Sequence, residues 1–178
     1  MIRKDFSRGS AHQVSLTAMF AALSLIFLYL AAIWPAGRLS LYFLSSIFVA
    51  GMLVEERPAM AFLCYAVVCG LGLLIVPGLL LVVPYALLFG HYGIGKYLLE
   101  RAVRDKITCF VLKLLYFDLF LAAVYFLAGE LLLGSLLAAV PLWVLIVAAQ
   151  VAFVIYDFLY SRVVLLYEQR IRPRLLRS

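Results

Sequence analysis

Charged residues are scarce in this chain. Asp, Glu, Lys and Arg make up 13% of its 178 residues, about half of their share in soluble domains. Hydrophobic residues make up 67%, and the mean hydropathy is +1.13. Too few polar side chains remain to cover the surface of a soluble domain. The composition therefore predicts an integral membrane protein with one membrane domain over residues 1–178.

The residue patterns of common catalytic and metal sites are missing. The sequence contains no HExxH motif, no GxSxG motif and no P-loop that would hold a nucleotide. Its three cysteines, Cys64, Cys69 and Cys109, lack CxxC spacing, and only two histidines are present. We therefore expect no enzymatic activity, no metal and no cofactor, and we interpret the cysteines as small apolar residues.

Six apolar runs are what the sequence does contain, each near the roughly 17–25 residues that span a bilayer. Their continuous apolar character predicts helices, because the strands of a membrane barrel alternate in polarity. Pro84 predicts a kink, and Gly134 and Ser135 predict a loop or re-entrant turn before a last helix that starts near Pro141. The expected fold is an all-α bundle of six transmembrane helices, at residues 12–34, 39–54, 59–76, 79–95, 107–128 and 139–161.

Basic residues are unevenly divided between the two sides that six spans define. Six spans place both tails on one side of the membrane, and the opposite side holds only Arg38. The side with both tails holds Arg3, Lys4, Arg8, Arg57, Lys96, Arg101, Arg104, Lys106, Arg162, Arg170, Arg172, Arg174 and Arg177. The positive-inside rule predicts that this basic side, with both termini, is cytoplasmic. Topology and contact with anionic lipid then explain the net charge of +6, and no nucleic-acid partner is expected. The connection Lys96–Lys106 is expected to be an amphipathic segment at the interface or a solvated loop.

Ionisable residues inside the apolar runs are the clearest candidates for function, because burying charge in hydrocarbon is costly. At 1.5 Å per residue, Lys113 and Asp157 lie roughly 9 and 8 Å below the cytoplasmic surface. Matching depth and opposite charge predict a structural ion pair between them. Asp118 and Gln150 both lie roughly 17 Å deep. They would share a hydrogen bond near the midplane, either in a substrate or proton site or as a contact between helices.

Aromatic residues near the external side are candidates for a ligand pocket. Arg38 is the only basic residue there, and would bind an anionic group or mark a helix end. Membrane proteins also place aromatic belts at both interfaces without any ligand. With the midplane pair, the predicted ligand-binding residues are Arg38, Tyr42, Tyr85, Asp118, Tyr125, Trp143 and Gln150.

Small residues in the first span, Ala18, Ala21 and Ala22, form an Ala-x-x-x-Ala pattern in Ser15-Leu16-Thr17-Ala18-Met19-Phe20-Ala21-Ala22-Leu23. With its size and predicted topology, the chain resembles the substrate-binding S components of energy-coupling factor transporters. That resemblance implies capture of a small molecule on the external side. It also implies docking of the first helix on a transmembrane coupling subunit driven by ATPase subunits, and small residues allow such close approach in lipid. The external half has few polar side chains, which favours a more apolar ligand than thiamine or cobalamin.

Two other functions fit the same pattern. A small membrane scaffold of cell-envelope assembly, similar to the rod-shape protein MreD, would need no pocket and would use its polar residues for packing or partner contacts. A proton-linked carrier would rest on Asp118 and Asp157, but the sequence shows no inverted repeat of the kind that many carriers have.

Overall fold

A computed structural model describes residues 3–54, 57–167 and 169, with residues 3–13, 128 and 130–139 described by their backbone only. The described chain is helical and contains no strand. Its elements are α1 (Arg3–Ile33), η1 (Pro35–Gly37), α2 (Arg38–Val54), α3 (Pro58–Ile75), η2 (Leu79–Leu81), η3 (Tyr85–Phe89), α4 (Tyr92–Ala102), α5 (Lys106–Ala139) and α6 (Leu142–Leu166).

Six helical segments are long and apolar enough to cross a membrane, and the chain is a multi-pass membrane protein. The apolar spans are Val14–Ile33, Pro35–Val54, Pro58–Ile75, Leu79–Ala102, Lys106–Leu127 and Leu142–Leu166. They differ from the expected spans mainly in the fourth, which extends past Gly95 to Ala102. Helix α5 also departs from expectation, because it continues to Ala139 through the stretch in which a loop or re-entrant turn was predicted.

Helix α2 lies at the centre of the bundle and contacts α1, α3, α4, α6 and η3. Its buried residues include the small Ser45, Ser46, Ala50 and Gly51. Small side chains allow neighbouring helix backbones to approach closely. Such residues are what this position requires, because α2 has neighbours on most of its circumference.

A pair of serines joins α1 to α2 in the buried core. The Ser24 hydroxyl donates to the Ser45 carbonyl at 2.7 Å, and the Ser45 hydroxyl donates to the Ser24 carbonyl at 2.8 Å. The Tyr85 hydroxyl lies 3.1 Å from Ser24 Oγ. These bonds satisfy polar groups that would otherwise be unpaired in an apolar environment. They therefore fix the pairing of α1 with α2 and attach η3 to both.

The fourth span is assembled from short pieces. Gly78 has a φ of +97°, a conformation that favours glycine, and it directly precedes η2. Pro84 precedes η3, a π-helical turn whose first residue, Tyr85, accepts a hydrogen bond from the Gly90 amide at 2.7 Å. Helix α4 then begins at Tyr92. Proline cannot donate a helical hydrogen bond, which accounts for an irregular turn at this point.

Asp105 caps the start of α5. Its Oδ2 accepts hydrogen bonds from the Thr108 amide at 2.8 Å and from the Thr108 hydroxyl at 2.6 Å. Both bonds favour the carboxylate, so the pKa of Asp105 lies below its ordinary value. This cap satisfies amide groups at a helix start that follows a short connection.

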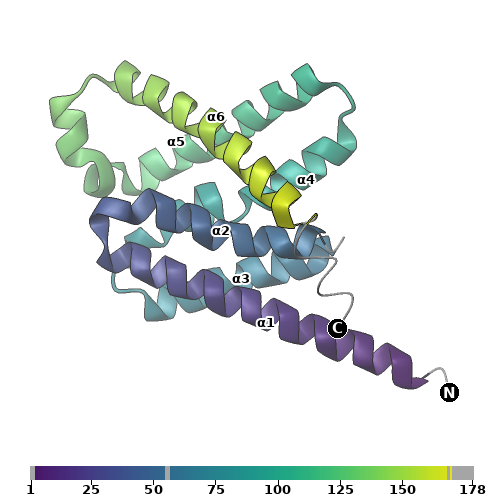
Figure 1. The fold of residues 1–178 in the computed structure, drawn as a ribbon. Coiled ribbons are helices and arrows are strands. Elements are labelled where there is room, and N and C mark those ends of the chain that lie inside the picture. The colour runs from purple at the N-terminus through teal and green to yellow at the C-terminus, as the bar shows by residue number, and fades with distance from the viewer. Residues whose placement is uncertain (1–2, 55–56, 168, 170–178) are drawn as a thin grey trace.

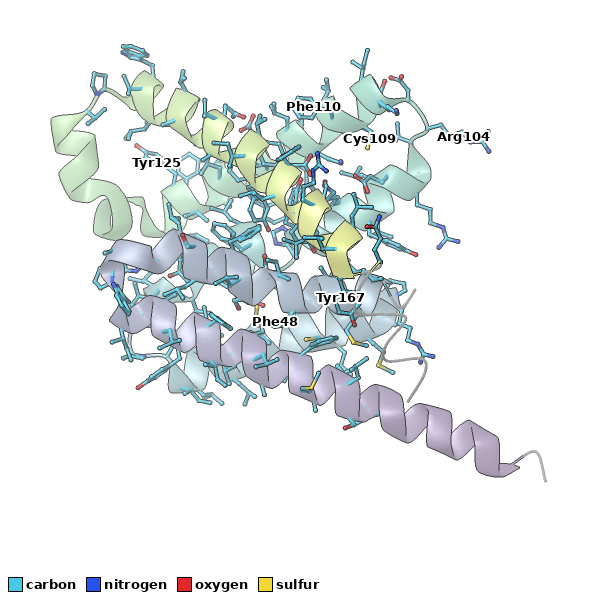
Figure 2. All side chains as sticks on the ribbon, viewed as in Figure 1. Phe48, Arg104, Cys109, Phe110, Tyr125 and Tyr167 are labelled. Atoms are coloured by element: carbon cyan, nitrogen blue, oxygen red, sulfur yellow. The ribbon has the colours of Figure 1, made fainter. Side chains whose placement is uncertain are left out.

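The start of α1 and the end of α6 lie at the same end of the molecule (Figure 1). The α4–α5 connection is also at that end, which Arg104 marks in Figure 2, whereas Tyr125 lies toward the α5–α6 turn at the opposite end. The strongly basic connections therefore gather at one end of the bundle.

Candidate functional site

A cavity of about 490 Å³ lies between α5 and α6. Among the described lining residues the walls are almost entirely apolar, and Asp118 is the only carboxylate, accompanied by Gln150. The lining residues from α5 include Leu121, Ala122, Val124, Tyr125 and Phe126, and those from α6 include Leu142, Leu145, Ile146 and Ala149. The cavity occupies the half of these two helices that leads toward the α5–α6 turn. Small-molecule pockets commonly combine apolar walls with a few polar groups in this way.

Asp118 and Gln150 meet across this cavity. Gln150 Nε2 donates a hydrogen bond to Asp118 Oδ1, so the two residues of equal expected depth are in contact. Gln150 Oε1 is buried and has no hydrogen-bond partner within the described part of the chain. The pair thus leaves an unused acceptor in an apolar environment, where such a group is costly.

A second polar cluster joins α4, α5 and α6 at the basic end of the molecule. Lys96 Nζ is in direct contact with Asp157 Oδ1, and it donates to Ser161 Oγ at 2.6 Å. Lys113 Nζ donates to Glu100 Oε1 at 2.5 Å and lies 3.8 Å from Asp157 Oδ1. Both lysines are buried. Two cations and two carboxylates share one site, so their formal charges cancel. We call these four residues, Lys96, Glu100, Lys113 and Asp157, the charge network.

Both carboxylates, Asp157 and Glu100, lie within 3.8 Å of both lysines, and Asp157 is the more buried of the two. It also accepts a hydrogen bond from the Tyr92 hydroxyl at 2.7 Å. The expected ion pair of Lys113 with Asp157 is therefore one edge of a larger arrangement. The closest cation to Asp157 is Lys96, which the sequence had suggested would lie in the connection after the fourth span. Lys96 was missed because helix α4 continues past Gly95.

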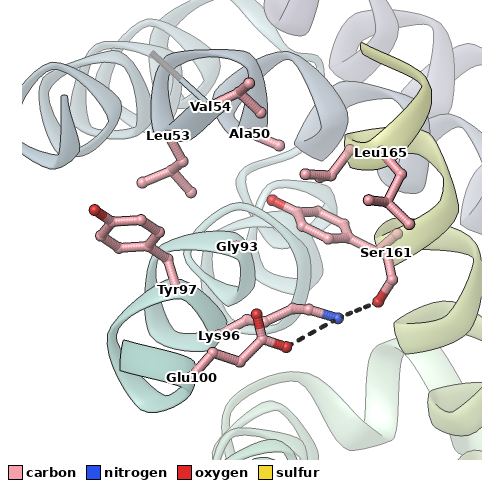
Figure 3. A pocket seen from close by; sticks show the side chains of 11 residues that line it. Ala50, Leu53, Val54, Gly93, Lys96, Tyr97, Glu100, Ser161 and Leu165 are labelled. Atoms are coloured by element: carbon pink, nitrogen blue, oxygen red, sulfur yellow. Dashed lines mark hydrogen bonds and ion pairs between the residues drawn. The ribbon is translucent and has the colours of Figure 1, made fainter. Parts of the chain in front are cut away.

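Beside the charge network lies a second cavity, of about 420 Å³ (Figure 3). Lys96 and Ser161 point toward each other at one wall of this cavity, and Leu53 and Val54 of α2 form part of the opposite wall. Tyr160 also lines it, and the buried Tyr160 hydroxyl has no hydrogen-bond partner among the described residues. This cavity is more polar than the one between α5 and α6, but its lysine is already neutralised by Asp157.

The other predicted ligand residues do not gather around one pocket. Tyr42 and Tyr85 are fully buried core residues that line neither cavity. The Tyr42 hydroxyl donates to the Leu81 carbonyl at 2.5 Å, and Tyr85 bonds to Ser24. Arg38 Nε donates to the Ala31 carbonyl at 3.1 Å and so caps the end of α1. Arg38, Tyr42 and Tyr85 therefore lie outside both cavities and bond to groups of the bundle itself.

Tyr125 and Trp143 remain on the surface of the bundle. Trp143 is 68% exposed and lines neither cavity, which is typical of an interfacial aromatic residue. Tyr125 is 41% exposed and does line the α5–α6 cavity. Of the seven predicted ligand residues, the structure therefore brings together Asp118, Tyr125 and Gln150.

The three alanines of the first span face different ways. Ala18 and Ala22 are exposed on the outer face of α1, together with Ser15. Ala21 is 7% exposed and belongs to the core that α1 forms with α2 and α3. Of the three predicted docking residues, Ala18 and Ala22 are therefore the exposed ones, and the Ala21 side chain is covered by the core.

No metal-binding group of three or more His, Cys, Asp or Glu side chains occurs within the described residues. The chain matches no protein-family model, no curated protein and no solved structure.

Proposed function

We propose that this chain is the substrate-binding membrane subunit of an ATP-driven uptake transporter, similar to the S components of energy-coupling factor transporters. The observation that carries the proposal is the α5–α6 cavity, in which Asp118 and Gln150 are the polar groups of an otherwise apolar site. An ionisable residue inside a membrane segment is a functional candidate, because hydrocarbon penalises charge. A cavity of about 490 Å³ has the volume of a small-molecule site.

The outer face of α1 supports the second half of the proposal, docking on a coupling subunit. Ser15, Ala18 and Ala22 recur at intervals of three and four residues, so they share one helix face, and all three are exposed. The opposite face of α1 packs on α2 and α3. The exposed small side chains would let a partner helix approach the α1 backbone closely. The sequence contains no P-loop, so the energy for uptake would come from separate ATPase subunits.

The proposal includes an orientation and a location. The basic connections and both chain ends would face the cytoplasm of a bacterial cell, following the positive-inside rule. The α5–α6 cavity would then lie in the external half of the membrane, on the side from which a ligand arrives. Docking through Ala18 and Ala22 would take place nearer the cytoplasmic end of α1.

A co-purification experiment tests both halves. The chain is co-expressed with the coupling and ATPase subunits of its host and purified through a tag on this chain, and bound small molecules are identified by mass spectrometry. We expect the wild type to retain the module, and we expect Ala18→Trp/Ala22→Trp to lose it, because the indole rings hold a partner helix away from the backbone. The small molecule should be retained, since its site lies between other helices.

The chain offers a matched control for that variant. Ala148 and Ala152 are exposed on α6 with the same spacing, so Ala148→Trp/Ala152→Trp adds the same bulk elsewhere and should keep the module. If both double variants lose the module equally, docking through α1 is wrong. If the wild type retains neither module nor small molecule, the transporter proposal gives way to an MreD-like membrane scaffold in cell-envelope assembly.

A further inference from the structure

We propose that the α5–α6 cavity binds an organic cation, a mainly apolar molecule that carries one amine or related positively charged group. This inference rests on the proposed function, because it names the class of substrate for the same cavity. Three independent features of the cavity carry it: an uncompensated carboxylate, an excess of hydrogen-bond acceptors and apolar walls.

The carboxylate of Asp118 has no cationic partner among the described side chains. Lys113 is the nearer of the two lysines in the same helix, five residues earlier, but it is held by Glu100 and Asp157. Among the described side chains, no Lys, Arg or His lines the cavity. A carboxylate inside a membrane segment is stabilised by a nearby positive charge, and here the ligand is the group that would supply it.

The hydrogen-bonding groups of the site also favour a cationic ligand, because they are mainly acceptors. A carboxylate only accepts hydrogen bonds, and Gln150 directs its amide donor at Asp118. The remaining polar atom of the Gln150 side chain, Oε1, is an acceptor that no described group satisfies. A ligand that contributes donors therefore complements the site. An ammonium group offers up to about three donors and the missing charge in one place.

The apolar walls of the cavity indicate that the part of the ligand beyond its charged group is apolar. Aliphatic side chains and Phe126 surround the polar pair, and Tyr125 offers an aromatic face that attracts cations as well as apolar groups. An anionic ligand would meet Asp118 with no basic residue to offset the repulsion. A neutral lipid chain would suit the walls but would leave Asp118 and Gln150 unsatisfied. An apolar cation fits both the walls and the polar pair.

The test compares three probes that share a naphthalene ring and differ in charge: 1-naphthylmethylamine, 1-naphthylmethanol and 1-naphthoate. Binding is measured by equilibrium dialysis on the whole chain in phosphatidylcholine nanodiscs, with empty nanodiscs to subtract partition into lipid. We expect the amine to bind at least about tenfold more tightly than the alcohol, since hydrogen bonds to charged groups are the stronger ones. We expect the naphthoate to bind more weakly than the alcohol.

Two variants locate the effect. Asp118→Asn should remove the preference for the amine while leaving the alcohol unchanged, and Gln150→Leu should reduce the preference by a smaller factor. Asp105→Asn is the matched control, because it neutralises an exposed carboxylate of the α5 cap outside the cavity. Its amine preference should equal that of the wild type.

Equal binding of amine and alcohol to the wild type would overturn the inference without needing any variant. An amine preference that survives in Asp118→Asn would also overturn it, as would the failure of all three probes to bind. Retention of the coupling module is measured separately, so the substrate class can fail while the proposed transport function stands.

Discussion

Asp157 is the more buried of the two carboxylates in the charge network, and both buried lysines and Tyr92 converge on it. We predict that Asp157→Ala lowers stability by about 3–5 kcal/mol, since it leaves buried cations without their partner. Lys96→Ala should be more damaging than Lys113→Ala. Lys96 contacts Asp157 directly, whereas Lys113 pairs mainly with the half-exposed Glu100. The measurement is the midpoint of thermal inactivation in detergent, with the exposed Lys106→Ala as the unaffected control.

A charge exchange separates the network from a simple pair. An isolated Lys113–Asp157 pair, as the sequence predicts, would recover part of its stability when the two residues are exchanged. In the network, the exchange places a lysine beside Lys96 and an aspartate beside Glu100, and like charges at such distances repel. We therefore expect Lys113→Asp/Asp157→Lys to be no more stable than Asp157→Ala. Recovery above the single variants would contradict the network.

Counting residues along each span was enough to predict which polar side chains share a depth. The rise of 1.5 Å per residue places Asp118 opposite Gln150 and Lys113 opposite Asp157, and both pairs are within contact range. Lys96 could not be found in this way, because its burial depends on where α4 ends. A useful signal was present in the sequence, since Lys96 and Glu100 are four residues apart and so share a helix face.

Close packing of α4 against α6 depends on the absence of a side chain at Gly93. A Cβ at Gly93 would lie 1.8 Å from the Tyr160 hydroxyl oxygen and 2.8 Å from its ring carbon Cζ. We predict that Gly93→Ala destabilises the protein by about 1–3 kcal/mol, as overpacking does in well-packed cores. Thermal inactivation in detergent measures the loss. Gly70→Ala is the control, because nothing lies within 4 Å of that position, and it should be neutral or stabilising by up to about 1 kcal/mol.

Removing the Tyr160 hydroxyl should relieve part of the clash. That hydroxyl has no hydrogen-bond partner among the described groups, so Tyr160→Phe alone should change stability little. Gly93→Ala/Tyr160→Phe should then be more stable than Gly93→Ala. If the double variant is as unstable as the sum of both changes, the close contact between α4 and α6 is not the cause.

Among the helices, the prolines of the sequence predicted correctly where helical segments begin and end, whereas the glycines did not. Pro77, Pro84 and Pro141 each lie where a helical segment ends or begins, because proline lacks the donor that a helix interior needs. Gly134 and Ser135 predict a loop or re-entrant turn, yet α5 passes through both. Glycine is more common in transmembrane helices than in soluble ones, so its usual meaning as a turn residue is weaker in such a sequence.

The whole molecule is packed unevenly. The first three helices form one core cluster with η3, whereas many large apolar side chains of α5 and α6 are exposed. Composition predicted six spans because each apolar run is long enough to cross a bilayer. It could not predict which helices pack centrally, since nearly every helix is apolar all round. The central place of α2 follows from its small residues, and the cavity from the separation of α5 and α6.

The orientation of the chain in the membrane determines on which side the α5–α6 cavity lies. The turns after α1, α3 and α5 carry only Arg38 as a basic residue, whereas the opposite connections contain Arg57, Arg101, Arg104 and Lys106. The positive-inside rule then predicts that reporter fusions after residues 36, 78 and 140 are external.

Fusions after residues 57 and 104 should be cytoplasmic and serve as internal controls. The third fusion belongs at residue 140, because α5 extends to Ala139. A cytoplasmic signal from any of the three external positions would contradict the six-span topology. The reversed pattern throughout would keep the six spans but place the cavity in the cytoplasmic half, where it could not capture a ligand from outside.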